Sequence, residues 1–312
     1  MSDQGRPLGL VVMAYGTPRT PGEVEAYYTH IRRGRPPTAE QLADLVRRYD
    51  AIGGISPLAE RTEAQRAALE RALAERMPGR WMVVLGQKHA APFIEDAVAE
   101  LADAGVRDAV GLVLAPHYSE FSVGEYQRRA VEAGERRGLG VRGIRHWHLE
   151  PAFLDFLADA TREARVGLPA NHKVLFSAHS LPERVLVDDP YATELRESAA
   201  AVAQRVGLSA ESEWDLCWQS AGRTPEPWRG PDVLEVIRDL GATGECEAVL
   251  VCAQGFTADH LEILYDLDVE ANAVAAEVGL VFARTRSLND DPAVMSALAE
   301  RVISRGTEAG ER

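Results

Sequence analysis

The sequence predicts an α/β protein made of two similar lobes, each with a parallel sheet flanked by helices and with the active-site cleft between the lobes. Short apolar runs alternate with longer amphipathic segments along the chain, and this alternation indicates parallel strands joined by crossover helices. The chain has 312 residues, of which 46% are hydrophobic. That length exceeds what a single core usually supports, so we expect two domains.

The apolar runs are short enough to be buried strands, and the segments between them repeat Ala, Leu and Val at the 3.6-residue spacing of a helix face. The expected strands are Leu8–Tyr15, Trp81–Leu85, Ala109–Ala115, Val174–Ser177 and Ala248–Cys252. The expected helices are Glu63–Ala74, Ile94–Ala104, Val123–Arg137, Leu154–Arg165 and Leu261–Ala276.

A weak internal repeat relates the two halves of the chain. The strand that ends in Ala14-Tyr15-Gly16-Thr17-Pro18 resembles the one that ends in Ala178-His179-Ser180-Leu181-Pro182. The simplest explanation is two similar lobes, 1–168 and 169–312, divided at the turn-rich stretch 167–171. Neither lobe has a GxGxxG or GxxxxGKS/T motif, so nucleotide binding is not expected.

Charge and composition narrow the class of partner. A formal net charge of -14 argues against nucleic acid or an anionic membrane, because both are themselves negatively charged. No apolar stretch is long enough to cross a bilayer, and Met1–Pro7 lacks the pattern of a secretion signal, so we expect a cytoplasmic protein. The three cysteines, Cys217, Cys246 and Cys252, include no CxxC pair. We interpret them as small buried side chains rather than metal ligands.

The first candidate for chemistry combines a histidine with carboxylates. His179 follows an apolar strand, and ligands of open α/β sheets bind beside the carboxyl ends of strands. Glu262, Asp266 and Glu270 follow at intervals of four residues, in a stretch, 239–283, that contains no Lys or Arg. Carboxylates with one imidazole suit a labile divalent metal such as ferrous iron. The alternative is an ordinary solvated acidic face.

Histidines other than His179 are weaker candidates. His260 lies on the same segment as Glu262 and competes with His179 for the metal role. The remaining six have no partner that spacing identifies: His30, His89, His117, His146, His148 and His172.

A second candidate is basic and aromatic. It spans Tyr27–Arg35, Arg47–Tyr49 and Gly53–Pro57. Arginines pair with carboxylates, and tyrosines offer flat apolar faces with a polar tip. A flat ligand with several carboxylates fits this set, although surface arginines beside a turn explain it equally well.

Taken together, these motifs resemble the ferrochelatase family, and more closely its bacterial coproporphyrin III branch. The resemblance covers nearly the whole chain. It rests on Val11–Pro18, Tyr27–Arg35, Tyr49–Leu58, Lys88-His89, Pro92–Asp96, Leu114–His117, Ser177–Pro182, Trp218–Ser220 and Gly255–Glu262.

The resemblance implies a lyase of haem biosynthesis that inserts ferrous iron into coproporphyrin III, forming iron-coproporphyrin III in a cleft between two Rossmann-like, chelatase-like lobes. It implies that His179 and Glu262 form the metal site, with Asp266 and Glu270 as a relay. Tyr15 would approach the iron from the other face of the macrocycle. The positions that would hold the porphyrin and its propionates are Arg32, Arg48, Tyr49, Ser56 and Tyr126.

The same resemblance sets expectations about cofactors and partners. Ferrous iron is a substrate, and no tightly bound cofactor is expected. An iron–sulfur cluster is not expected either, because no cysteine follows Cys252. The arginine-rich stretch Tyr27–Pro37 favours a substrate with four carboxylates. Contact with neighbouring haem-pathway enzymes would be transient.

The expected mechanism bends the macrocycle, so that two pyrrole protons leave as iron enters. A neutral His179, together with Glu262, would accept those protons or hand over the metal. The alternatives are a protoporphyrin IX ferrochelatase, a sirohydrochlorin chelatase and a non-enzymatic haem or metal carrier.

Overall fold

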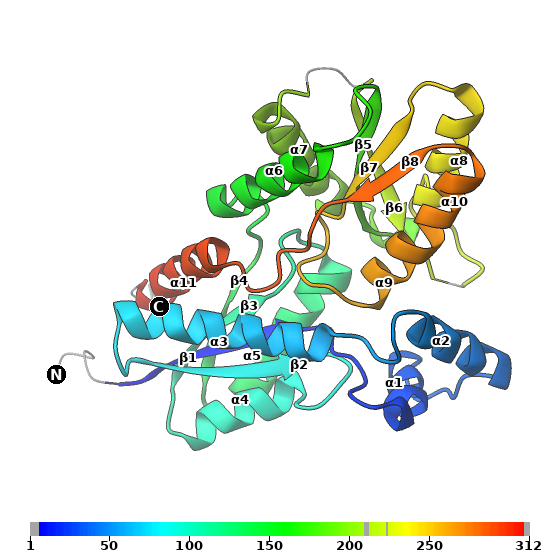
Figure 1. Cartoon of the computed structure of the whole chain (residues 1–312). Coiled ribbons are helices and arrows are strands. Elements are labelled where there is room, and N and C mark those ends of the chain that lie inside the picture. The colour runs from blue at the N-terminus through cyan, green and yellow to red at the C-terminus, as the bar shows by residue number, and fades with distance from the viewer. Residues whose placement is uncertain (1–5, 209–211, 223, 309–312) are drawn as a thin grey trace. The chain divides into compact units, whose positions relative to one another are not determined.

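The computed structural model describes residues 6–208, 212–222 and 224–308, which divide into two compact units (Figure 1). Unit 1 draws on Met1–Val46, Ile55–Trp147 and Asn289–Arg312, and unit 2 on Arg47–Gly54 and His148–Leu288. Each unit therefore includes a segment from elsewhere in the sequence. The domain boundary expected between residues 168 and 169 stays a prediction.

Unit 1 is built on a parallel four-stranded sheet with the order β2-β1-β3-β4. Its strands are β1 (Leu8–Ala14), β2 (Trp81–Gln87), β3 (Asp108–Val113) and β4 (Gly140–Ile144). The central strand β1 is almost entirely buried, as expected for a strand covered on both faces. Its Leu10 lies opposite Val83 on β2 and Val110 on β3.

The helices of unit 1 follow from the strand order. The crossover from β1 to β2 runs toward one edge and that from β2 to β3 toward the other, so right-handed crossovers place their helices on opposite faces. Accordingly α3 (Leu58–Arg76) covers one face and α4 (Ile94–Asp103) the other, where it packs against α5 (Glu125–Glu135). A π-helical turn (Glu120–Gly124) precedes α5. The helices α1 (Val24–Ile31) and α2 (Ala39–Ala51) follow β1, and α2 passes into unit 2 at Arg47.

Unit 2 repeats the same strand arrangement, with the order β6-β5-β7-β8, all parallel. Its strands are β5 (His172–His179), β6 (Trp214–Gln219), β7 (Ala248–Cys252) and β8 (Val281–Arg284). Its helices are α7 (Tyr191–Arg205), α8 (Val233–Thr243), α9 (Leu261–Leu264) and α10 (Asn272–Glu277), with a π-helical segment (Asp266–Ala271) just before α10. The two α/β lobes expected from the internal repeat are confirmed.

Two helices belong to the unit that does not contain the strand before them. The helix α6 (Pro151–Arg165) follows β4 of unit 1 but lies in unit 2, where it packs on α7 and β7. Likewise α11 (Pro292–Thr307) follows β8 of unit 2 but packs on α3, β3 and β4 of unit 1. In each unit the helix covers the same face as the first crossover helix, so the repeat extends to this pair.

The elements expected from the sequence are confirmed within a few residues, with two differences in type. The helix expected over Val123–Arg137 begins in the π-helical turn Glu120–Gly124. The segment expected as one helix, Leu261–Ala276, is divided by its π-helical turns. Strands β4, β6 and β8 were not expected, because they are short or carry polar residues among the apolar ones. Within the described ranges, no helix combines the length and the apolar character that crossing a bilayer requires.

Candidate active site

The strand order of unit 2 indicates where a ligand would bind. The connections leave β5 and β7 toward opposite edges of the sheet, and the carboxyl ends of such a pair flank the usual ligand crevice of an open α/β sheet. His179 is the last residue of β5, and Glu262 lies on α9, in the connection that follows β7. Gly255 lets this connection approach closely, because a Cβ there would lie 2.6 Å from Cβ of Ala178.

His179 and Glu262 face each other at this point. Nε2 of His179 lies 3.6 Å from Oε1 of Glu262, and Nε2 of His260 lies 3.5 Å from Oε2 of the same carboxylate. The Nδ1 atoms of the two rings donate to backbone carbonyls, that of Ser180 for His179 and that of Ala258 for His260. This pattern is typical of metal-binding histidines, because it fixes the ring and leaves Nε2 for the metal.

Neighbouring side chains fix the backbone of both residues. The hydroxyl of Tyr191 donates to the carbonyl of His179 at 3.2 Å, and Nε2 of Gln219 donates to the carbonyl of Glu262 at 2.9 Å. Gln219 is itself held by Oγ of Ser177, which donates to its Oε1 at 2.9 Å. Adjacent strands β5 and β6 thus position α9 through one buried and one partly buried hydrogen bond.

The charges of His179 and Glu262 stabilise each other. Burial would lower the pKa of His179, but the Glu262 carboxylate outweighs it and, with the carbonyl of Ser180, raises that pKa to about 9. Burial would raise the pKa of Glu262, but the charge and hydrogen bond of His179, assisted by His260, hold it well below its usual range. An imidazolium and a carboxylate are therefore the resting forms near neutral pH.

The three carboxylates of the acidic series follow one another along α9 and the π-helical segment. Four residues of an α-helix rotate by about 400°, so a strict α-helix would turn each successive carboxylate about 40° further around the axis. The wider i→i+5 turn counteracts this drift, and Glu270 N donates to Tyr265 O in this pattern at 2.9 Å. Both Glu262 and Glu270 raise the pKa of Asp266, which indicates that the series lies along one side.

Asp266 is buried in the middle of this series. Burial, with the charge of Glu262 as the next cause, raises its pKa to about 7, despite a hydrogen bond from Ser220 and the nearby charge of Arg48. Nη1 of Arg48 lies 3.6 Å from Oδ1 of Asp266. A carboxyl group with this pKa exchanges a proton readily near neutral pH.

Unit 2 also contains two of the porphyrin candidates, Arg48 and Tyr49. The Arg48 guanidinium lies over the ring of Tyr265 at 4.9 Å, and Nη1 of Arg47 donates to the hydroxyl of Tyr265 at 2.9 Å. Arg48 is partly exposed, whereas Tyr49 is almost fully buried. The structure therefore brings Arg48 together with the acidic series.

Unit 1 contains the other four candidates. Tyr15, directly after β1, is 43% exposed, and Arg32 is half-buried with its guanidinium over the ring of Tyr28 at 5.5 Å. Ser56 and Tyr126 are buried. Burial, together with the nearby Tyr15 and Glu125, raises the pKa of Tyr126 well above its usual value, so its hydroxyl stays protonated.

The Lys88-His89 segment supports Tyr15 and Tyr126. Nζ of Lys88 lies 5.2 Å above the ring of Tyr126 and 2.8 Å from the carboxylate of Glu125. The backbone amide of His89 donates to the carbonyl of Tyr15 at 2.9 Å, and the two rings lie 4.6 Å apart. Burial lowers the pKa of His89 to about 3, and the positive charge of Lys88 is the second cause. Its imidazole is therefore neutral at physiological pH.

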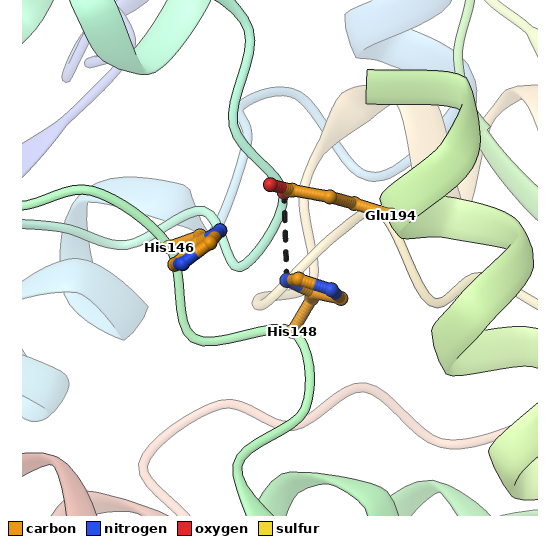
Figure 2. Close-up of side chains that lie close together, drawn as sticks. All are labelled: His146, His148 and Glu194. Carbon is orange, nitrogen blue, oxygen red and sulfur yellow. Dashed lines mark ion pairs between the residues drawn. The ribbon is translucent and has the colours of Figure 1, made fainter. Parts of the chain in front are cut away.

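His148 has partners that its spacing did not reveal. In unit 2 its Nδ1 lies 3.4 Å from Oε2 of Glu194 (Figure 2), and its Nε2 lies 3.0 Å from Oε2 of Glu197. Both glutamates lie on α7, one turn apart. His146, which Figure 2 also labels, belongs to unit 1. These ion pairs fasten the start of unit 2 to α7.

The sequence did not predict the residues that position the site residues by hydrogen bonds. Gln219, Ser220 and Tyr191 contact His179, Glu262 or Asp266 only through the fold, and their separation along the chain gives no periodic signal. The one available indication was the motif Trp218–Ser220, which carries part of the resemblance and contains Gln219 and Ser220.

Known proteins similar to this chain match it over almost its whole length. A family model described as Ferrochelatase matches residues 7–305. A protein of Geobacillus kaustophilus named coproporphyrin III ferrochelatase is 44% identical over 311 residues, covering 97% of this chain and 98% of that protein. One of the same name from Bacillus subtilis is 44% identical over 307 residues, covering 96% and 98%.

Solved structures of similar fold include SirB from Bacillus subtilis with Fe3+, which has a TM-score of 0.58 and 12% identity over 96% of each chain. CbiX, described as the terminal enzyme of sirohaem biosynthesis in denitrifying bacteria, has a TM-score of 0.55 and 14% identity, covering 95% of this chain and 98% of that one. At these identities the likeness concerns the fold alone.

Proposed function

Because this chain belongs to the ferrochelatase family, we propose that it is a lyase that inserts ferrous iron into coproporphyrin III, forming iron-coproporphyrin III in haem biosynthesis. The observation that carries this proposal is the His179–Glu262 pair at the carboxyl edge of the sheet in unit 2. The name shared by its relatives supports the choice of porphyrin.

His179 and Glu262 take the iron. The ring of His179 offers Nε2, since its Nδ1 is engaged by Ser180, and Glu262 offers an ionised carboxylate. An imidazole with a carboxylate suits ferrous iron without binding it too tightly for release. His260, on the other oxygen of Glu262, orients the carboxylate.

The protonation state of His179 changes the expected mechanism. The neutral ring expected from the sequence is not the resting form, because Glu262 raises the pKa of His179 to about 9. Iron must therefore displace one proton from His179 when it binds. The imidazolium is also a proton donor in the resting site, so His179 becomes a proton acceptor only after it has lost that proton.

Asp266 and Glu270 accept the protons that leave the porphyrin. Coproporphyrin III loses two pyrrole protons when iron enters, and Asp266, with a pKa of about 7, takes up a proton and releases it near neutral pH. Glu270 is half-buried four residues further along the same series, which gives the proton a route toward solvent.

Positive and aromatic side chains hold the porphyrin. Arg32 and Arg48 bind propionates through charge-assisted hydrogen bonds. Ser56, Tyr49 and Tyr126 also hold the porphyrin, and Tyr15 approaches the iron from the other face. The protein works in the cytoplasm, without a tightly bound cofactor or an iron–sulfur cluster, and contacts neighbouring haem-pathway enzymes transiently.

Anaerobic absorbance spectroscopy with ferrous iron tests the substrate. Coproporphyrin III, protoporphyrin IX and sirohydrochlorin are offered in parallel, and we expect the fastest metallation with coproporphyrin III. Faster metallation of protoporphyrin IX or of sirohydrochlorin would overturn the substrate assignment. Tight binding without turnover of any of the three would identify a carrier instead of an enzyme.

A further inference from the structure

Two histidines of unit 1 lie in direct contact outside the His179–Glu262 site. Nδ1 of His30, in the last turn of α1, lies 3.0 Å from Nδ1 of His89, in the loop after β2. The two residues are separated by 59 positions in the sequence. Their rings meet nearly edge to face, with centroids 5.2 Å apart.

Contacts with neighbouring aromatic rings hold both imidazoles in place. The ring of His89 packs against Tyr15 at 4.6 Å, and its backbone amide is fixed by the carbonyl of Tyr15. The ring of His30 stacks on Phe93 at 5.2 Å. His30 is exposed and His89 half-buried, so the pair is supported on the protein side and open on the other.

The basic side chains beside the two histidines each form an ion pair with a glutamate. Nζ of Lys88 lies 2.8 Å from a Glu125 oxygen, and Arg129 donates two hydrogen bonds of 2.8 Å to the carboxylate of Glu95. These carboxylates offset the two cations only in part, since Lys88 and Arg129 still lower the pKa of His89. His89 itself is neutral at physiological pH, which is the form that binds a metal.

We propose that His30 and His89 form a second metal site, which takes a divalent transition ion that prefers imidazole nitrogen, such as Zn2+ or Ni2+. Two nitrogens bound tetrahedrally at about 2.0–2.1 Å lie about 3.3 Å apart. The observed 3.0 Å is short of this by about 0.3 Å. A small rotation of the exposed His30 ring lengthens the separation of the two nitrogens by this amount. Water molecules fill the remaining coordination positions of the metal.

This site differs in chemistry from the proposed iron site. It has two imidazoles and no carboxylate ligand, and borderline ions such as Zn2+ and Ni2+ favour imidazole more than the harder Mg2+ does. The proposal concerns metal binding without porphyrin, so it does not rest on iron insertion. It makes unit 1 a place where a transition metal binds beside Tyr15.

Zn2+ titration of the metal-free full chain by isothermal calorimetry tests the proposal. The starting protein is His179→Ala, which removes the other site, and we expect it to bind one equivalent. Adding His30→Phe or His89→Phe keeps the aromatic packing but removes the ligand, and should weaken binding by about tenfold or more. Adding His172→Gln instead is the control, because both ring nitrogens of His172 are already engaged.

An unchanged isotherm on adding His30→Phe and His89→Phe would overturn the proposal, as would the same loss on adding His172→Gln. Should either added variant fail to fold, substoichiometric Ni2+ added to the His179→Ala chain replaces it. Its paramagnetism should broaden the ring resonances of His30 and His89 selectively. Sharp resonances for both rings would contradict the site, whatever the outcome of the iron-insertion assay.

Discussion

Replacing Glu262 by Gln tests the coupling on which the candidate active site depends. The variant keeps the size of the side chain but removes the charge that raises the pKa of His179 to about 9. Burial, which lowers that pKa, then acts with less opposition. We expect the pKa of His179 to fall from about 9 to its ordinary value of 6.5 or below.

The same substitution lowers the pKa of Asp266 below its value of about 7, because the charge of Glu262 is the second cause of that increase after burial. NMR titration of the metal-free protein measures both groups, following the imidazole of His179 and the carboxyl carbon of Asp266. Glu270→Gln is the control for His179 alone, since Glu270 is not among the causes that raise the pKa of His179 but does raise that of Asp266.

Stability changes with pH in a defined direction. The pKa of His179 is higher in the folded protein than the ordinary 6.5, so the ion pair stabilises fully below pH 6.5 and loses that contribution as pH rises toward 9. Both side chains are about one-third exposed, and solvent screening limits the pair to about 1 kcal/mol.

Urea denaturation of wild type and Glu262→Gln should therefore show a difference near pH 6 that shrinks by pH 9.5. A His179 pKa that stays near 9 in the variant would refute the reasoning, because the shift would then have another cause. A stability difference that grows with pH would refute the sign of the linkage.

Three further predictions concern metal binding, substrate binding and packing. Metal affinity at His179 should rise with pH up to about pH 9, as a competing proton is lost; an affinity independent of pH, measured by calorimetry between pH 6 and 9, would contradict this. Arg32→Ala should weaken coproporphyrin III binding by about tenfold, through loss of a charge-assisted contact, whereas the control Arg71→Ala should not. Fluorescence quenching measures the affinity of both variants. Equal affinities of the two variants for coproporphyrin III would remove Arg32 from the porphyrin site. Phe176→Ala, at a fully buried position that packs against Trp214, should lower the free energy of unfolding by about 3–5 kcal/mol, and a loss under 1 kcal/mol in denaturant melts would refute its place in the core.

The strands at the centre of each sheet could be predicted because they are buried on both faces. β1 and β7 are continuous apolar runs, and such runs need no knowledge of the rest of the fold. The edge strand β8 has only four residues, all partly exposed. Its strand state depends on pairing with β7, which the local sequence does not encode.

The candidate site could likewise be predicted only in part. His179 and Glu262 are strand-tip and helix-start residues, and their positions follow from the order of elements along the chain. The roles of Gln219 and Tyr191 depend on hydrogen bonds between elements, which no local pattern of residues predicts. The protonated state of His179 was missed for the same reason, since it arises from a distance of 3.6 Å between residues 83 positions apart.

The most direct test of the central claim compares iron insertion into coproporphyrin III by wild type and by His179→Ala, under anaerobic conditions at neutral pH. The change of the porphyrin absorbance to that of its iron complex measures insertion, and fluorescence quenching measures porphyrin binding in the same samples. We predict turnover by wild type, and binding without insertion by His179→Ala. Insertion by the variant at the wild-type rate, or none by wild type, would contradict the account.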